Sequence, residues 1–196
     1  TGVTAQIGGN GDDVETVRLN RIGRYATGEA LGGAEIVSYH AARNRLFVVN
    51  SGASQVEVLD LSEPRTPTQD AVLNASDLVA SEGSVVSSVG GTNSVDVNGN
   101  IVAAAIEADP ATENGAVAFY DPSSLEFVNA VSVGPLPDKV TIAPGGNYVV
   151  VANEGEPGDS TDPAGSVSVI DISQGVQNAS VSTATFDQFD GSLADK

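Results

Sequence analysis

Oxygen-bearing side chains recur along this sequence in a pattern that would suit a hard divalent cation. Short apolar segments follow one another in pairs along the chain. Some of these side chains lie at the beginning of the first segment of a pair, and others directly follow the second segment. Carboxylate and amide oxygens are the ligands that Ca²⁺ and Mg²⁺ prefer in proteins. The predicted ligands are Glu35, Asn93, Glu107, Asp109, Asp138, Glu154, Glu156, Asp159 and Asp162.

Two sets of these residues occupy corresponding positions in a repeated unit. Counting back from the second apolar segment of each unit aligns Glu35, Asn93 and Asp138. If the two segments are antiparallel strands, the residues before the first and after the second lie at one edge of the structure. Like charges gathered there would repel one another unless a cation neutralised them. The positions directly after the second segment are Ser51, Glu107 and Glu154.

Two interpretations of these acids remain open. The first is a divalent-cation site at the mouth of a central channel, completed by further copies of the unit. The second is a set of solvated loop acids in turns stiffened by proline, since Asp109 and Glu156 each precede a proline. The spacing is not that of an EF-hand loop. The metal prediction therefore depends on convergence of the loops and not on a sequence motif.

No catalytic residue and no cofactor-binding residue is predicted. The chain has no cysteine, which excludes thiolate chemistry and disulfides. His40 is the only histidine, and it is predicted to be a surface residue at the end of the strands opposite to the acids. A histidine base placed beside a nucleophile is therefore not expected. The glycine-rich stretch 8–13 lacks the preceding strand and following helix of a phosphate-binding loop.

The charge balance narrows the classes of partner. Eight basic and 26 acidic residues give a formal net charge of −18 over 196 residues. Such a surface repels nucleic acids and anionic membranes, and it suits cations, a saline medium or solubility. No apolar run approaches the roughly 20 residues of a membrane-spanning helix. We therefore expect no nucleic-acid partner and no membrane span.

Short apolar runs separated by Gly, Pro, Asn and Asp predict strands, and they repeat. Asp60, Asp121 and Asp171 mark the same place in three copies, at spacings of 61 and 50 residues. Each copy has three clear strands and a fourth, weaker one. The clear strands are predicted at 34–39, 46–50 and 56–62, at 93–97, 101–106 and 117–123, and at 138–142, 148–153 and 167–173.

Four antiparallel strands at a period near 50 residues indicate an all-β fold, a β-propeller with about three blades in this chain. Because propellers use four or more blades, we expect the rest of the same propeller, or another chain, to complete the ring. An open three-sheet fold is the alternative. The predicted boundaries are a flexible arm at 1–16, a closing strand at 17–31, blades at 32–86, 87–134 and 135–190, and the start of a truncated continuation at 191–196.

The third copy carries the most specific motif of the chain. Residues 152–157 read Ala-Asn-Glu-Gly-Glu-Pro, and residues 105–110 of the second copy read Ala-Ile-Glu-Ala-Asp-Pro. From about Leu19 onward the chain resembles the N-terminal portion of the choice-of-anchor I family, also labelled mesenchyme-specific-cell-surface-glycoprotein-like, among the YVTN-type β-propellers. The resemblance implies a longer bacterial protein, secreted or on the cell surface, with further blades. Some members of the family are labelled alkaline phosphatases.

Three functions follow as expectations. The first is an extracellular binding or scaffold module that presents its loops to a protein or glycan, with Ca²⁺ (or Mg²⁺) on the acidic loops. The second is a metal-dependent phosphoesterase whose remaining site lies in further blades. The third is a structural subunit of an extracellular assembly. The absence of a complete catalytic set favours the first.

Overall fold

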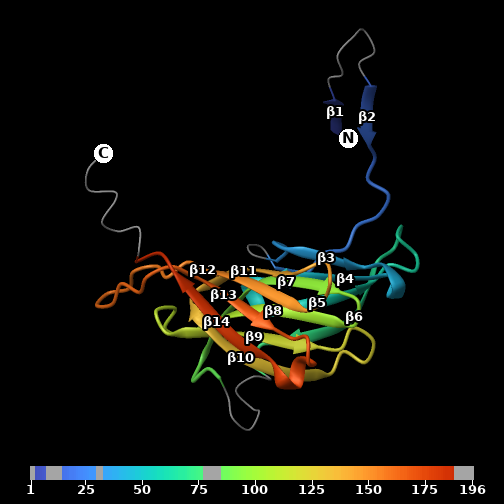
Figure 1. Ribbon diagram of the computed structural model, residues 1–196. Coiled ribbons are helices and arrows are strands. Elements are labelled where there is room, and N and C mark those ends of the chain that lie inside the picture. Colours follow the sequence, from blue (N-terminus) through green and yellow to red (C-terminus); the bar gives the residue numbers. More distant parts are fainter. Residues whose placement is uncertain (1–2, 8–14, 30–32, 77–84, 188–196) are drawn as a thin grey trace.

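Three four-stranded antiparallel sheets follow one another along the chain (Figure 1). The computed structural model describes residues 3–7, 15–29, 33–76 and 85–187. The expected continuation at 191–196 lies outside the described residues.

Sheet 1 contains β3 (Val37–His40), β4 (Arg45–Asn50), β5 (Gln55–Asp60) and β6 (Thr68–Asn74). Sheet 2 contains β7 (Val89–Asn98), β8 (Ile101–Ala108), β9 (Asn114–Tyr120) and β10 (Phe127–Pro135). Sheet 3 contains β11 (Pro137–Ile142), β12 (Tyr148–Asn153), β13 (Ser166–Asp171) and β14 (Ser180–Thr185).

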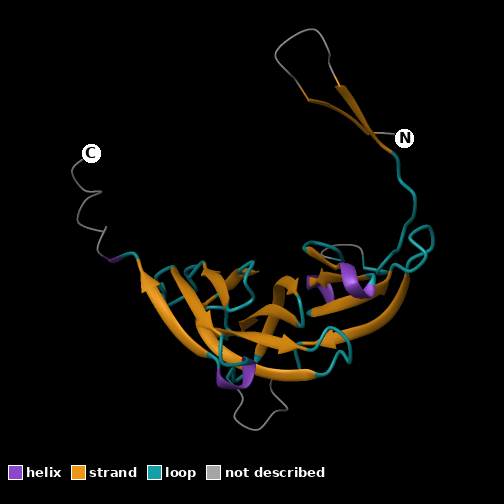
Figure 2. Cartoon of the chain, turned by 45° about the vertical axis from the view of Figure 1, so that its right-hand side comes forward, coloured by secondary structure: helices purple, strands orange, loops and turns teal. Residues whose placement is uncertain are grey.

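The sheets are arranged side by side in an arc (Figure 2). Among the described residues, three short 3-10 turns lie between strands, η1 (Ala41–Arg43), η2 (Ser51–Ala53) and η3 (Val176–Asn178). The first strands β3, β7 and β11 are neighbours from sheet to sheet. We call the face of each sheet on the side of the preceding part of the chain its leading face, and the opposite face its trailing face.

Two hydrophobic cores fill the two spaces between the sheets. In the first core, Phe47, Val49, Val56 and Val58 on the trailing face of sheet 1 pack against the leading face of sheet 2. The second core joins the trailing face of sheet 2 to the leading face of sheet 3. Its buried members are Ala103, Ala105, Val117, Phe119, Val133, Val140, Ile142, Val149, Val151, Ile170 and Ile172.

Position in the arc explains the difference between two apolar strands. Sheet 2 is covered on both faces, so residues 102–106 of β8 are all buried and read as an unbroken apolar run. In β12 of sheet 3, burial alternates, because side chains in a strand point to opposite faces. Val149 and Val151 are buried on the leading face, whereas Tyr148 and Val150 on the trailing face are exposed.

The repeated aspartates form turns at the end of the third strand of each sheet. The Oδ1 atoms of Asp60, Asp121 and Asp171 accept the backbone N–H two residues further on, at 2.7, 2.7 and 2.8 Å. Hydrogen bonds from the neighbouring serines lower the pKa of all three carboxyl groups. Ionised, they stabilise the fold at neutral pH. That contribution is lost as the pH falls through their lowered pKa values.

The first strands are joined by side chains that bond to the backbone of the next sheet. Ser38 Oγ accepts the N–H of Val97 at 3.1 Å, and Asp96 Oδ2 accepts the N–H of Ile142 at 2.8 Å. Ser38 Oγ also donates to Asp96 Oδ1 at 3.0 Å. The strand registers place Ser38 and Asp96 at corresponding positions, one residue after Val37 and Val95. The same link is therefore made twice.

A second repeated link corrects the prediction for His40. His40 is the last residue of β3, it is only 8% exposed, and its Nε2 lies 2.7 Å from the carbonyl oxygen of Gly99 in sheet 2. Asn98 occupies the corresponding position in sheet 2 and donates to the carbonyl oxygen of Ala143 in sheet 3 at 3.0 Å. The prediction of a surface histidine was wrong, because the next sheet covers the end of the strand.

The N-terminal part differs from the expected arm and closing strand. β1 (Val3–Ile7) and β2 (Glu15–Leu19) pair with each other as an antiparallel hairpin that stands away from the three sheets (Figure 1). Residues 20–29 contain no strand. They lie along the leading face of sheet 1, where Gly23 meets the carbonyl oxygen of Pro64 too closely for any Cβ.

The Asp96 link gives a first testable prediction. Replacing Asp96 by Ala leaves the buried N–H of Ile142 without its acceptor and should lower the free energy of unfolding by about 3 kcal/mol. Asp96→Asn keeps one acceptor oxygen and should lose only about 1 kcal/mol. Urea unfolding monitored by circular dichroism measures both values. A wild-type midpoint in the alanine variant would contradict the assigned link.

Candidate functional site

The strand registers align the predicted site residues. Val37, Val95 and Val140 of the first strands pair with Val48, Ala104 and Val151 of the second strands. The residues two positions earlier correspond in the three sheets and lie at one edge of the arc. They are Glu35, Asn93 and Asp138.

Each of these three residues lies at an irregularity in its strand. Asn93 is the extra residue between the paired positions of Thr92 and Ser94, and Asp138 is the extra residue between Pro137 and Lys139. In sheet 1, the N–H of Glu35 and the carbonyl oxygen of Ile36 both bond to Val49. Bulges of this kind redirect a side chain relative to the regular alternation. The sequence repeats a bulge together with an oxygen-bearing residue.

Sheet 2 joins two of its three predicted ligands directly. Asn93 Nδ2 donates to Glu107 Oε2 at 3.1 Å and to the carbonyl oxygen of Pro137 in sheet 3 at 3.2 Å. Gly90 and Gly91 make room for the Glu107 carboxylate, since a Cβ at either position would lie 3.0 Å from Glu107 Oε1. The geometry therefore fixes an amide and a carboxylate at the junction of sheets 2 and 3.

Sheet 3 brings together carboxylates that repel one another. Repulsion from Asp138, then desolvation, then repulsion from Glu156 raise the pKa of Glu154. All three side chains are exposed. Above its raised pKa, the ionised Glu154 therefore disfavours the folded state. A bound cation at this edge would remove that cost.

A cleft of about 560 Å³ opens beside this group, between two loops. Residues 110–113 follow β8 of sheet 2, and residues 156–161 follow β12 of sheet 3. Glu113, Glu156 and Asp159 line the cleft. The sequence analysis did not select Glu113, because it lies three residues beyond the loop proline and has no counterpart in sheet 3.

The structure does not gather all of the predicted ligands. Glu35, Asp109 and Asp162 are exposed, and none of the side-chain hydrogen bonds within the described residues connects them to the others. Within the part of the chain that the structure describes, no group of three or more Asp, Glu or His side chains is placed to hold a metal ion. A cation at this edge would need further ligands from water or from outside the described residues.

A buried carboxylate also escaped the sequence analysis. Glu57 is 2% exposed and accepts a hydrogen bond from Asn50 Nδ2 at 2.7 Å. Within the described residues, Asn50 Oδ1 is buried without a hydrogen-bond partner. Burial, followed by the hydrogen bond and negative charge of Glu57, raises the pKa of Tyr25. The sequence did contain a sign of this buried carboxylate, since Glu57 is a charged residue inside the apolar run 56–59.

The repeated sheets, the neighbouring first strands and the loops at one edge define a β-propeller-like protein. The chain belongs to the choice-of-anchor I domain family, whose model matches residues 35–196. The resemblance inferred from the loop motifs is therefore confirmed, and so is the all-β propeller fold.

Two solved structures share this fold. A putative 6-phosphogluconolactonase from Bacteroides fragilis is 13% identical, with a TM-score of 0.57, over 79% of this chain and 39% of that chain. A protein from Lactobacillus plantarum is 13% identical, with a TM-score of 0.53, over 94% of this chain and 48% of that chain. The chain thus spans less than half the length of either structure.

No curated protein matches the chain. Among the described residues, none of the helices has the length and apolar character needed to cross a membrane.

The repulsion at Glu154 predicts a pH-dependent stabilisation. Because the pKa of Glu154 is raised in the folded state, its charge costs stability above that pKa, and the cost disappears once the group is protonated. Glu154→Gln should therefore raise the thermal midpoint at pH 7 and leave it unchanged below the ordinary glutamate pKa of 4.5. Differential scanning calorimetry across this pH range measures the effect. Equal shifts at both extremes would exclude charge repulsion as the cause.

Proposed function

We propose that this chain is part of a secreted or cell-surface binding or scaffold module, and that its acidic loop edge is the ligand-binding face. One observation supports the proposal most directly: at an exposed edge, Asp138 and Glu156 both repel the Glu154 carboxylate and raise its pKa. A group of like charges that destabilises its own fold is a common property of binding sites, which are completed by a ligand of opposite charge.

Three features favour a cationic ligand. The corresponding positions offer carboxylate or amide oxygens in every sheet, which are hard ligands. Asn93 and Glu107 are already held by a hydrogen bond, so one carboxylate is positioned before any ligand arrives. The cleft between the loops of sheets 2 and 3 provides access to Glu156. We propose Ca²⁺, or Mg²⁺, bound in part through water, as the ion that mediates contact with a protein or glycan.

Catalysis is less well supported by the arrangement. His40 is buried, bonded to the carbonyl oxygen of Gly99, and lies at the end of the strands opposite to the acids. A phosphoesterase would need a metal cluster with a nucleophile or activated water, and the described residues gather no such cluster. The lactonase title belongs to a neighbour that is 13% identical, which shows the fold alone.

Calcium binding should stabilise the folded chain. Extracellular calcium modules commonly have a Kd near 1 mM, so 10 mM Ca²⁺ should add about 1.4 kcal/mol to the free energy of unfolding. Thermal unfolding with CaCl₂, MgCl₂ and NaCl at matched ionic strength measures the gain. Glu154→Gln with Glu156→Gln should abolish it.

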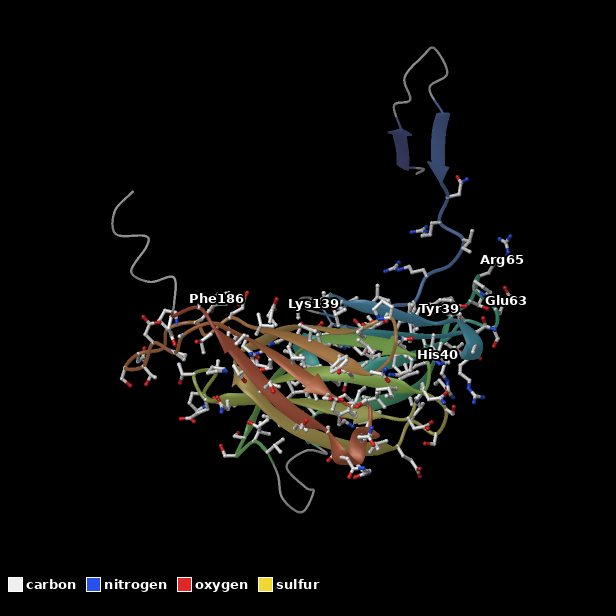
Figure 3. All side chains as sticks on the ribbon, viewed as in Figure 1. Tyr39, His40, Glu63, Arg65, Lys139 and Phe186 are labelled. Atoms are coloured by element: carbon white, nitrogen blue, oxygen red, sulfur yellow. The ribbon has the colours of Figure 1, made fainter. Side chains whose placement is uncertain are left out.

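The matched control is Glu63→Gln, an exposed acid in the turn between β5 and β6, which should keep the full calcium effect. Figure 3 labels Glu63, near Arg65 and on the side of the molecule away from Phe186. An identical response to CaCl₂ and NaCl would exclude a specific cation site. Hydrolysis of a phosphomonoester that EDTA abolishes would instead support the metal-dependent phosphoesterase.

A further inference from the structure

The edge of the arc opposite to the acidic loops carries residue types that are scarce elsewhere in the chain. The stretch 39–45 runs from the end of β3 to the start of β4, and it contains the only histidine and two of the eight basic residues. Figure 3 shows Tyr39 and His40 close together at this edge, on the side of the molecule away from Phe186. The stretch lies at the junction of sheets 1 and 2, because His40 is bonded to Gly99.

A cleft of about 450 Å³ opens at this junction. Its walls are residues 39–43 of sheet 1 and residues 97–100 of sheet 2, so each wall is the turn between a first and a second strand. Small-molecule sites commonly have volumes of about 300–1,000 Å³. The cleft is therefore large enough for a small ligand, and its two walls belong to sheets that the hydrogen bonds of Ser38 and His40 hold together.

His40 gives this cleft an unused hydrogen-bond acceptor. The residue lines the cleft, and its Nε2 lies 2.7 Å from the carbonyl oxygen of Gly99. Because a carbonyl oxygen can only accept, Nε2 carries the proton, and the neutral ring then has a lone pair at Nδ1. Within the described residues, Nδ1 is buried without a hydrogen-bond partner. A buried polar atom without a partner costs free energy, so a donor that reaches it from the cleft would stabilise the site.

The next junction shows that an imidazole is not needed to join two sheets. Asn98 occupies the position of His40, since each is the last residue of a first strand and lies three residues after a paired valine, Val37 or Val95. Asn98 makes the link to sheet 3 with an amide, which donates to the carbonyl oxygen of Ala143 at 3.0 Å. The histidine therefore adds to the shared link a second nitrogen that the link does not use.

Two exposed donors, Arg43 and Asn100, line the same cleft. Within the described residues, neither side chain takes part in a hydrogen bond or an ion pair, although Arg43 interacts electrostatically with Asp121. Arg45, two residues further on, differs because it pairs with Asp70 at 2.7 Å. The guanidinium group of Arg43 and the amide of Asn100 are therefore available to a ligand.

These groups favour a neutral ligand with several hydroxyl groups. Arg43 would repel a cation, and the net charge of −18 would repel an anion, which also has no proton for His40 Nδ1. A hydroxyl group both donates and accepts, so neighbouring hydroxyls can donate to the imidazole and accept from Arg43 and Asn100. Apolar contacts to the C–H groups of a sugar ring would come from Ala41, Ala42 and Val97.

We propose that this cleft binds a neutral saccharide, with one hydroxyl group donating to His40 Nδ1 and neighbouring hydroxyl groups accepting from Arg43 and Asn100. The bond from Nε2 to Gly99 keeps the imidazole in the tautomer that accepts at Nδ1. The cleft lies at the end of the strands opposite to the acidic loops. Saccharide binding is therefore separate from cation binding at those loops and does not depend on it.

The single histidine allows a direct test by NMR. In protein labelled with nitrogen-15 histidine, every imidazole signal comes from His40, and two-bond proton–nitrogen spectra report Nδ1 and Nε2 separately. The probes are methyl α-glucopyranoside, methyl α-mannopyranoside, methyl β-galactopyranoside and N-acetylglucosamine, with glycerol as the control.

At least one saccharide should shift the Nδ1 signal in a saturable way, with a Kd of about 1 mM for a ligand of this size. Glycerol at the same concentration should leave the signal in place. An Nδ1 signal that none of the four saccharides moves, or that glycerol moves equally, would overturn the proposal.

Two substitutions remove proposed contacts and keep the fold. His40→Asn removes the imidazole and should preserve the link between the sheets, as Asn98 does at the next junction. Arg43→Gln changes an exposed side chain. Each should weaken binding of the saccharide that shifts Nδ1 by about tenfold, measured by isothermal titration calorimetry on variants whose circular dichroism is that of the wild type. Wild-type affinity in both folded variants would overturn the assigned contacts.

The matched control is Arg65→Gln, which removes an exposed arginine from the turn between β5 and β6, outside the cleft. It should leave saccharide affinity unchanged. The double variant Glu154→Gln with Glu156→Gln should also bind the saccharide with wild-type affinity, which separates this cleft from the proposed cation site. Loss of saccharide binding in either of these variants would overturn the assignment to this cleft.

Discussion

The carboxylate of Asp96 holds the first strands of all three sheets together. It accepts the hydroxyl of Ser38 from sheet 1 and the backbone N–H of Ile142 from sheet 3. A β-strand in the interior of a protein must satisfy its outward N–H groups, and here the acceptor comes from the neighbouring sheet. The sheets share no backbone ladder, and these hydrogen bonds fix the position of each first strand along its neighbour in the next sheet. The loop residues at the edge where the first strands begin are aligned from sheet to sheet in the same way.

Packing adds to this alignment without defining it as sharply. The two cores are built from Val, Ala and Phe, and such contacts tolerate small shifts between sheets. Hydrogen bonds between the sheets do not tolerate such shifts, because each requires one donor to meet one acceptor. These bonds involve the side chains of Ser38, Asp96, His40 and Asn98. The bulges at Asn93 and Asp138 are consequently held beside one another. Repulsion at Glu154 is a cost of that positioning, and it follows from a rigid scaffold carrying a charged edge.

Much of the fold could be predicted from the sequence. Alternating apolar runs and the repeated aspartates gave three sheets, and the alignment of Glu35, Asn93 and Asp138 agrees with the strand registers. Pairing within a sheet is local, and turn residues mark it in the sequence. The sequence showed that the aspartates repeat, and the structure adds that each of them accepts a backbone N–H in a turn.

Contacts between sheets could not be read in the same way. Asp96 and His40 are polar residues near strand ends, and nothing adjacent in sequence shows that another sheet covers them. The same holds for Glu57, which is buried on a face whose neighbours lie far away along the chain. The candidate cation ligands were predicted to lie at one edge of the structure, but the distances between separate loops depend on how the sheets pack. This is why the structure joins Asn93 to Glu107 and leaves Asp162 apart.

The account depends most on the claim that side chains of one sheet satisfy backbone donors of the next. Hydrogen exchange of individual amides, followed by NMR, tests it directly, because the N–H groups of Val97 and Ile142 point away from their own sheets toward Ser38 and Asp96. The account predicts that both amides exchange as slowly as the interior amides of β12. Exchange as fast as that of the exposed turn at Gly145 would contradict it.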